Sequence, residues 1–401
     1  MRIENKSLKS QISVLTSQFS KQMSFDNRIK IGVLGGGQLG RMLIQASIDL
    51  DLHIKSLDPD ANAPCKWIAH EFQVGSLQDY ATVMNFANDC DIVTIEIESV
   101  NIDALEDLEK AGKKVYPQPK VLRVIQDKRV QKTFYKEHNL PTADFILTEN
   151  KAELKQYLGM LPAVHKLGKG GYDGRGVQII RTEADIEKGF DQPSVLEKMV
   201  DFEKELAVIV ARNEAGEVNT FPVVEMVFHP EANLVEYLFS PANISDEVKT
   251  EAENIAKATA DALGIIGILA VEMFLTKDQK ILINEVAPRP HNSGHQSIRA
   301  NDVSQYEQHL RAILNLPLGD TSEHLPSAMV NLLGEEGFEG EVKYEGMNEV
   351  LAVKGIHPFL YGKKITKPYR KMGHVTILAQ DFDKLKEKVN FVKNTLKVKS
   401  Y

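Results

Sequence analysis

The sequence predicts a mixed protein that begins with an α/β domain around a parallel sheet and continues into an α+β region. Between residues 28 and 120, short apolar runs alternate with helical patterns, which is typical of doubly wound parallel sheets. Beyond residue 141 the strand-like runs cluster, with fewer helices between them, which indicates an α+β arrangement. At 401 residues the chain has room for about two to four domains of ordinary size.

Residues 1–27 precede the first predicted strand. They are polar and rich in Ser, Lys and Gln, and they lack the apolar core of about 7–15 residues that a signal peptide has. We expect an extended or disordered segment, which a misassigned start codon ahead of Met23 would explain. The alternative is a short amphipathic helix, because Leu8, Ile12 and Leu15 are spaced at helical intervals.

The first domain is expected at residues 28–120 and ends at a proline-containing stretch. Its predicted strands are Ile29–Leu34, His53–Leu57, Asp91–Ile97 and Lys114–Tyr116. Its predicted helices are Leu39–Leu50, Ala81–Ala87 and Asn101–Ala111. Strands that alternate with helices in this way place the helices on both faces of the sheet.

The second domain is expected at residues 121–315, and several short strands are expected in residues 316–401. Helices are predicted at Val121–Asn139, Ser245–Leu263 and Ser304–Leu314, and Ser245 is the expected N-cap of its helix. Strands are predicted at Ala163–Lys166, Gln178–Arg181, Ser194–Lys198, Glu205–Ala211, Thr220–Val224, Gly267–Leu275 and Lys280–Val286.

Composition excludes several classes of function. The formal net charge of −8 argues against a general nucleic-acid binder. No run of about 18 apolar residues exists, so we expect no membrane-spanning helix. Cys65 and Cys90 are too few for a disulfide framework and fit a reducing compartment, so we expect a cytoplasmic protein.

A first glycine loop matches the dinucleotide fingerprint. Residues 35–40 read G-x-G-x-x-G between a predicted strand and a predicted helix, and Asp58 follows at the end of the next strand. Alone, this pattern predicts an NAD-dependent dehydrogenase. The alternative is a glycine turn that merely lets strand and helix pack closely. A Walker A site is excluded, because Arg41 and Met42 stand where Lys and Ser or Thr belong.

A second glycine loop, residues 168–176, holds five glycines in nine residues. Backbone amides in such a loop can fold over phosphate oxygens. The alternative is a flexible hairpin tip. Further along, Glu272 and Glu285 each interrupt an apolar run, which is costly unless the carboxylate is paired or bound to a metal. With the Asn284 amide they form an oxygen set that suits Mg²⁺, or Mn²⁺, when phosphates complete the coordination.

Taken in order, four motifs resemble the N5-carboxyaminoimidazole ribonucleotide synthetases, an ATP-grasp family of bacterial purine biosynthesis. They are GGGQLGRM at 35–42, GGYDGRG at 170–176, NEVAPRPHNSGH at 284–295 and RKMGH at 370–374, and the resemblance covers about residues 28–380. It implies an ATP-grasp fold: a Rossmann-like N-terminal domain at 28–120, an ATP-grasp domain in two lobes at 121–315, and a small β-rich C-terminal domain at 316–401. It replaces the dehydrogenase interpretation.

The resemblance also implies an activity and partners. ATP and bicarbonate are used to carboxylate the exocyclic amine of 5-aminoimidazole ribonucleotide, through carboxyphosphate, with ADP and phosphate as products. Mg²⁺ is the implied metal, and a homodimer the implied assembly. The alternatives are another ATP-grasp ligase, such as formate-dependent glycinamide ribonucleotide transformylase or biotin carboxylase, and a non-catalytic nucleotide-binding protein. The last would lack a metal ligand, yet Glu272, Asn284 and Glu285 are all present.

Site residues follow from the same resemblance. Those implied for ATP are Lys128, Lys166, Gly171, Tyr172, Asp173, Gly174, Arg175, Gly176, Val177, Glu197, Lys198, Met199, Val200, Glu205, His229, Asn284 and Glu285. Arg129 competes with Lys128 for its role, and Val177 stands where the family has Gln. The metal ligands implied are Glu272, Asn284 and Glu285.

Residues implied for the acceptor nucleotide are Gln38, Glu98, Tyr172, Asp173, Arg289, His291, Asn292, Ser293, Lys363 and Arg370. Those implied in catalysis are Asp173, Glu285 and Arg289. Glu96 competes with Glu98, because strand alternation predicts that both side chains share a face. Residues 354–380 contain six Lys or Arg and no acid, which suits a phosphate anchor or, alternatively, a solvated basic face.

Overall fold

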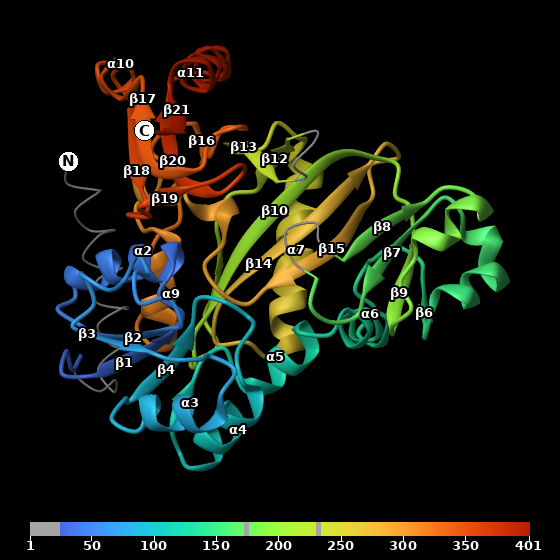
Figure 1. The fold of residues 1–401 in the computed structure, drawn as a ribbon, viewed down its shortest axis with the longest axis horizontal. Coiled ribbons are helices and arrows are strands. Elements are labelled where there is room, and N and C mark those ends of the chain that lie inside the picture. The colour runs from blue at the N-terminus through green and yellow to red at the C-terminus, as the bar shows by residue number, and fades with distance from the viewer. Residues whose placement is uncertain (1–24, 172–175, 230–233) are drawn as a thin grey trace, which may run out of the picture.

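The computed structural model describes residues 25–171, 176–229 and 234–401. The predictions for residues 1–24 and for the tip of the second glycine loop lie outside these ranges. Figure 1 shows the N-terminal region (blue to cyan) beside long central strands, with a small lobe (green) on one side and the C-terminal region (orange to red) on another.

The N-terminal region is built around a five-stranded parallel sheet in the order β3-β2-β1-β4-β5, which confirms the predicted α/β architecture. The central strand β1 is covered on both faces, and its Ile31 and Val33 are fully buried, as parallel sheets require. The strands are β1 (Lys30–Leu34), β2 (His53–Asp58), β3 (Glu71–Val74), β4 (Ile92–Ile95) and β5 (Lys114–Val115). The helices are α2 (Gln38–Ile48), α3 (Tyr80–Ala87) and α4 (Ile102–Lys110).

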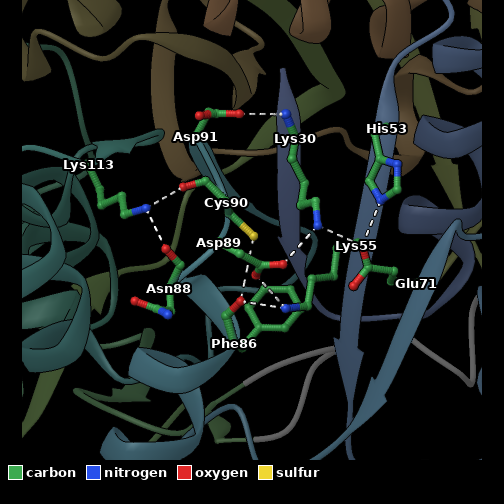
Figure 2. A network of polar contacts seen from close by, with 10 residues as sticks. All are labelled: Lys30, His53, Lys55, Glu71, Phe86, Asn88, Asp89, Cys90, Asp91 and Lys113. Atoms are coloured by element: carbon green, nitrogen blue, oxygen red, sulfur yellow. Dashed lines mark hydrogen bonds and ion pairs between the residues drawn. The ribbon is translucent and has the colours of Figure 1, made fainter. Parts of the chain in front are cut away.

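A network of ion pairs ties the strands together at their amino ends (Figure 2). Lys30 Nζ lies 2.7 Å from a Glu71 oxygen and 2.8 Å from an Asp89 oxygen. Lys55 Nζ contacts Asp89 at 2.7 Å, and His53 Nε2 contacts Glu71 at 2.8 Å. In open α/β sheets ligands bind at the carboxyl ends of the strands. This network therefore stabilises the sheet at the edge opposite the expected ligand site.

The helix predicted over Val121–Asn139 is wrong as one element, because the chain forms two helices there. These are α5 (Pro119–Ile125) and α6 (Lys128–Glu137). The Asp127 side chain accepts a hydrogen bond from the Arg129 amide and caps α6. Aspartate is among the strongest N-cap residues, so it starts a new helix rather than continuing the old one.

The small lobe is an antiparallel sheet in the order β6-β9-β7-β8. Its strands are β6 (Phe145–Thr148), β7 (Ala163–Leu167), β8 (Val177–Ile180) and β9 (Ser194–Lys198), and it carries the 3₁₀ helices η1 (Lys151–Met160) and η2 (Glu183–Lys188). The strands β7 and β8 flank the second glycine loop, so this sheet holds the loop at its edge.

A nine-stranded sheet forms the centre of the molecule. Its first part contains β10 (Phe202–Arg212), β11 (Val218–Thr220), β12 (Val224–Phe228), β13 (Val235–Ser240), β14 (Gly267–Thr276) and β15 (Ile281–Ala287), covered by α7 (Asp246–Leu263). Ser245 caps α7, as predicted. The strand predicted at Thr220–Val224 is wrong: β11 ends and β12 begins there, because Pro222 cannot donate a ladder hydrogen bond.

The same sheet continues into the C-terminal region, because β13 pairs with β16. The strands concerned are β16 (Ser327–Leu333), β18 (Ile356–Leu360) and β20 (Lys371–Leu378). A separate three-stranded sheet contains β17 (Gly340–Glu345), β19 (Ile365–Thr366) and β21 (Lys397–Ser400). The remaining helices are η3 (Asn292–Gly294), α8 (Ser297–Ala300), α9 (Gln305–Ile313), α10 (Met347–Leu351) and α11 (Phe382–Thr395). In the described ranges, no helix is both long and apolar enough to cross a membrane.

Candidate active site

The first glycine loop is satisfied from within the protein. The Glu96 carboxylate accepts hydrogen bonds from the amides of Gly37 (2.9 Å) and Gly40 (2.6 Å) at the start of α2. Asp58 accepts one from the Gly36 amide at 2.7 Å. A Cβ at Gly37 would lie 2.4 Å from a Glu96 oxygen. The amides that a dinucleotide phosphate would need are thus already bound to carboxylates of the protein, so the loop does not offer them to a dinucleotide.

Glu96 and Glu98 do not share a strand face, contrary to the prediction. The strand β4 ends at Ile95, so side-chain alternation does not extend to either glutamate. Glu98 instead reaches across to Arg289, whose Nε lies 2.8 Å from a Glu98 oxygen. This ion pair joins the N-terminal region to the segment after β15. It favours Glu98 over Glu96 as the glutamate at the candidate site.

Lysines and carboxylates meet between the small lobe and the large sheet. Lys128, at the start of α6, places Nζ 2.5 Å from a Glu285 oxygen. Lys166, on β7, contacts Glu197 at 3.1 Å and the Asn284 amide oxygen at 3.0 Å. The structure therefore brings together residues from both lobes that the sequence predicted to bind one nucleotide. Lys128, rather than Arg129, makes the contact in this cluster, since Arg129 pairs with Glu149.

A β-bulge explains how two consecutive residues of β15 reach the same lysines. Glu285 pairs with Glu272 on β14, but the next pair along is Ile283 with Met273, so Asn284 is the extra residue. A bulge breaks the strict alternation of side chains between the two faces. Asn284 and Glu285 can thereby both face the lysine cluster.

The acids at this place repel one another. Burial and the neighbouring Glu285 and Glu205 carboxylates raise the pKa of Glu272. The adjacent Lys128 cation lowers the pKa of Glu285. Burial raises the pKa of Glu205 to about 7. A divalent cation would relieve this repulsion, so the residues fit a metal. Within the described residues no three His, Cys, Asp or Glu groups are close enough together to hold a metal by themselves.

The segment after β15 carries the polar residues predicted for the acceptor. His291 Nε2 lies 3.3 Å from a Glu272 oxygen, and its Nδ1 lies 2.9 Å from Ser293 Oγ. Burial, Arg289 and Lys371 lower the pKa of His291 to about 3, so its ring is neutral. Both amide atoms of Asn292 are buried without a hydrogen-bond partner, although buried amides are normally satisfied.

A contact between distant parts of the chain completes this side. Lys363 Nζ donates to the Gln38 side-chain oxygen at 2.6 Å and to the Lys371 carbonyl at 2.7 Å. Gln38 is the first residue of α2, whereas Lys363 lies between β18 and β19. The structure thus joins the first glycine loop to the basic C-terminal stretch.

The remaining predicted residues make contacts outside these two clusters or at their edge. Arg370 donates to the Ile365 carbonyl at 2.6 Å on the surface. The His229 ring packs edge-on against Tyr369, with ring centres 5.8 Å apart, so it faces the C-terminal region. In the second glycine loop the ends Gly171 and Gly176 lie close together, and Val177 pairs with Lys166. The predictions for Tyr172, Asp173, Gly174 and Arg175 fall outside the described residues.

The proposed hinge for a base, residues 197–200, leaves β9 toward the surface. The Lys198 amide donates to the Asp144 carbonyl at 2.8 Å, and the Met199 amide to the Pro162 carbonyl at 3.0 Å. These two amides hold the hinge against its own lobe.

Sequence reasoning missed two lysines at this site. Lys132 is only 1% exposed, and its Nζ lies 3.1 Å from the Glu197 carboxylate. Its position four residues after Lys128 on α6 was the available signal, since such residues share a helix face. Lys371 belongs to the RKMGH motif, and its charge acts on both Glu272 and His291.

Three family models match the chain in succession. They are described as a ribonucleotide synthetase preATP-grasp domain (residues 28–126), an ATP-grasp domain (133–306) and a phosphoribosylaminoimidazole carboxylase C-terminal domain (327–388). Their order matches the three regions of the fold.

Individual relatives agree. N5-carboxyaminoimidazole ribonucleotide synthase of Bacillus subtilis is 37% identical over 371 residues, which cover 91% of this chain and 95% of that protein. The chloroplastic phosphoribosylaminoimidazole carboxylase of Vigna aconitifolia is 38% identical over 89% of this chain, but only 65% of that longer protein is spanned. The crystal structure of N5-carboxyaminoimidazole ribonucleotide synthetase from Thermotoga maritima is 42% identical, with a TM-score of 0.87 over 93% of this chain and 100% of that one.

A further solved structure carries ligands. It is the N5-carboxyaminoimidazole synthase from Aspergillus clavatus in complex with ADP and 5-aminoimidazole ribonucleotide, 32% identical, with a TM-score of 0.84 over 92% of this chain and 98% of that one.

Proposed function

Because the chain belongs to the N5-carboxyaminoimidazole ribonucleotide synthetase family of ATP-grasp ligases, we propose that it carboxylates the exocyclic amine of 5-aminoimidazole ribonucleotide at the expense of ATP. Bicarbonate is the proposed carbon source, and ADP and phosphate are the other products of this step of purine biosynthesis. The observation that carries the proposal is the convergence of Lys128, Lys166 and Glu285 between two lobes, directly beside the segment that contains Arg289.

The nucleotide occupies the space between the lobes in this proposal. Lys128 and Lys166 bind its phosphates through charge-assisted hydrogen bonds. The Val200 amide binds the base, and Glu205 accepts hydrogen bonds from the ribose hydroxyls. Amides of the loop at 168–176 cradle the phosphates.

Glu272 and Glu285, with the Asn284 amide, are the residues that would hold Mg²⁺ or Mn²⁺ in this proposal. Two carboxylates that repel each other across β14 and β15 support this assignment. When bound, the metal neutralises charge on the phosphates during phosphoryl transfer.

The acceptor nucleotide occupies the opposite side of the site. Gln38 and Lys363 bind it across the junction between the N-terminal and C-terminal regions, and Arg370 adds a second cation for its phosphate. Arg289 stabilises carboxylate or phosphoryl charge that develops near the amine. Its ion pair with Glu98 keeps the guanidinium aimed at this side.

A homodimer in the cytoplasm is the proposed state of the protein. The mass of the purified protein, measured by analytical ultracentrifugation, tests the dimer. A monomeric mass at micromolar concentration would contradict it.

Release of ADP at fixed ATP and bicarbonate tests the activity. We expect ADP only when 5-aminoimidazole ribonucleotide is present, with one carboxylated product for each ADP. Glycinamide ribonucleotide with formate serves as the control acceptor for the nearest alternative ligase. ADP release that needs the control acceptor, or that ignores both acceptors, would overturn the proposed reaction. ATP binding without any turnover would favour a non-catalytic protein.

A further inference from the structure

The backbone of His291 is held by one buried side chain. The His291 amide donates to Gln305 Oε1 at 2.8 Å, and Gln305 Nε2 donates back to the His291 carbonyl at 2.7 Å. This pair of bonds satisfies both backbone groups of one residue, much as a neighbouring strand would. Gln305 is fully buried, and it is the first residue of α9. The helix packs against α2 and β14, at the junction of the N-terminal region with the large sheet (Figure 1).

Gln305 itself has little freedom to move. The backbone amide of Gln305 donates to Ser297 Oγ at 2.9 Å, and the side-chain Nε2 lies 3.3 Å from His295 Nδ1. A Cβ at Gly294 would lie only 2.6 Å from the Gln305 side-chain amide, so the turn between them has no space for a larger residue. The clamp on His291 is therefore anchored at both ends.

What the clamp fixes is the start of the acceptor segment. His291 caps the short η3 turn, where it accepts a hydrogen bond from the Ser293 amide. The same residue aims its ring at Glu272. A shift of the His291 backbone would displace the ring, the buried Asn292 amide and the Ser293 hydroxyl together.

We infer that Gln305 is a positioning residue for the acceptor nucleotide, acting through the backbone of His291. This inference rests on the proposed function, because it assigns the 291–293 segment to the acceptor. Gln305 contacts His291, His295 and Ser297, and none of these is among the residues proposed to bind ATP. Loss of the clamp should therefore weaken use of the acceptor and spare use of ATP.

The same helix offers a matched control. Gln308, one turn further along α9, is also fully buried. Its Oε1 accepts from the Gly319 amide at 2.8 Å, and its Nε2 donates to the Gly319 carbonyl at 3.0 Å. This second clamp has the same chemistry, but it holds a loop that contributes no residue to the proposed site. Substitutions at the two glutamines should cost similar stability and differ in catalysis.

The experiment compares Gln305→Met with Gln308→Met in the full chain, by steady-state kinetics for each substrate and by thermal melting. For Gln305→Met we expect kcat/KM for 5-aminoimidazole ribonucleotide to fall about 10- to 100-fold, the range for a misplacement near 1 Å, with the KM for ATP within about twofold of wild type. For Gln308→Met we expect both Michaelis constants unchanged and a similar fall in melting temperature.

Equal kinetic effects of the two variants, or equal rises in both Michaelis constants for Gln305→Met, would overturn the inference. Should a methionine variant fail to fold, Gln305→Glu and Gln308→Glu repeat the comparison, because each keeps the acceptor of its clamp and loses the donor. Turnover by the wild-type protein distinguishes failure of the proposed function from failure of the Gln305 inference. Wild-type turnover without the 5-aminoimidazole acceptor refutes the proposed function, whereas acceptor-dependent wild-type turnover with no Gln305 effect refutes only the clamp.

Discussion

Lowering the pH from 7.5 to 5.5 should cost the small lobe about 1.3 kcal/mol of unfolding free energy through one histidine, His165. Its ring is fully buried on β7. The Phe190 amide donates to Nδ1 at 3.2 Å, and Nε2 lies 3.0 Å from Thr148 Oγ1. Because Nδ1 accepts, the neutral ring carries its proton on Nε2. A second proton at Nδ1 would face the Phe190 N–H.

The magnitude follows from the two pKa values. Burial lowers the pKa of His165 from 6.5 to about 4 in the folded protein. Between these values the unfolded chain binds a proton that the folded chain does not, so stability falls as the pH falls. Each pH unit in this window is worth about 1.4 kcal/mol, and little is lost above pH 7, which gives about 1.3 kcal/mol from 7.5 to 5.5.

Urea unfolding of wild type and His165→Gln at both pH values isolates this contribution, with small-lobe unfolding followed by hydrogen exchange. Glutamine can still accept from Phe190 and donate to Thr148, but it does not titrate. The other buried histidines are present in both proteins, so their contributions cancel in the difference. We expect the variant to lose about 1.3 kcal/mol less than wild type. Parallel losses would mean that His165 ionises normally inside the folded lobe, and the reasoning would be refuted.

Three further predictions concern the proposed site. Glu285→Gln should lower kcat at least about 10²-fold while leaving the fold intact, because it removes an anionic metal ligand but keeps the shape; ADP release within threefold of wild type would remove Glu285 from the metal site. Lys363→Ala and Arg370→Ala should each weaken acceptor binding about 10-fold or more and leave the KM for ATP unchanged, whereas equal rises for both substrates would make this stretch structural. Lys132→Met should raise the KM for ATP and lower the melting temperature, because it strips the buried Glu197 of one of its two cations; a wild-type melting curve would contradict this role.

Local signals predicted most of the architecture. Alternation of apolar runs and helical patterns indicated the parallel sheet around β1, and the structure confirms it. The strand β3 was not predicted, because its four residues are only partly buried and carry no clear alternation. Asp127 and Pro222 are the sequence signals for the helix boundary and the strand boundary. They were outweighed by the helical pattern around Asp127 and the apolar pattern around Pro222.

The site was predictable as a set of motifs and not as a set of contacts. The second glycine loop and the segment around Glu285 each form a short continuous motif, so the family resemblance could assign their residues. The contact of Gln38 with Lys363 joins residues 325 positions apart, and no local pattern encodes it. Gln305 could not be found for the same reason, whereas Lys132 had only its position four residues after Lys128 on α6 as a signal. A buried lysine or glutamine looks like any polar residue until the fold supplies its partners.

The Glu96 carboxylate occupies the backbone amides of the first glycine turn. The turn therefore does not bind the dinucleotide phosphate that its glycine pattern predicts. A dinucleotide phosphate approaching α2 would find the amides of Gly37 and Gly40 already hydrogen-bonded to the Glu96 carboxylate. Searches that score only the glycines and a downstream acid will count such a turn as a cofactor site. The distinguishing mark lies elsewhere in the chain, in a glutamate placed directly after the strand beside β1. An internal carboxylate of this kind stabilises the compact strand-to-helix turn of nucleotide-binding proteins without any bound nucleotide.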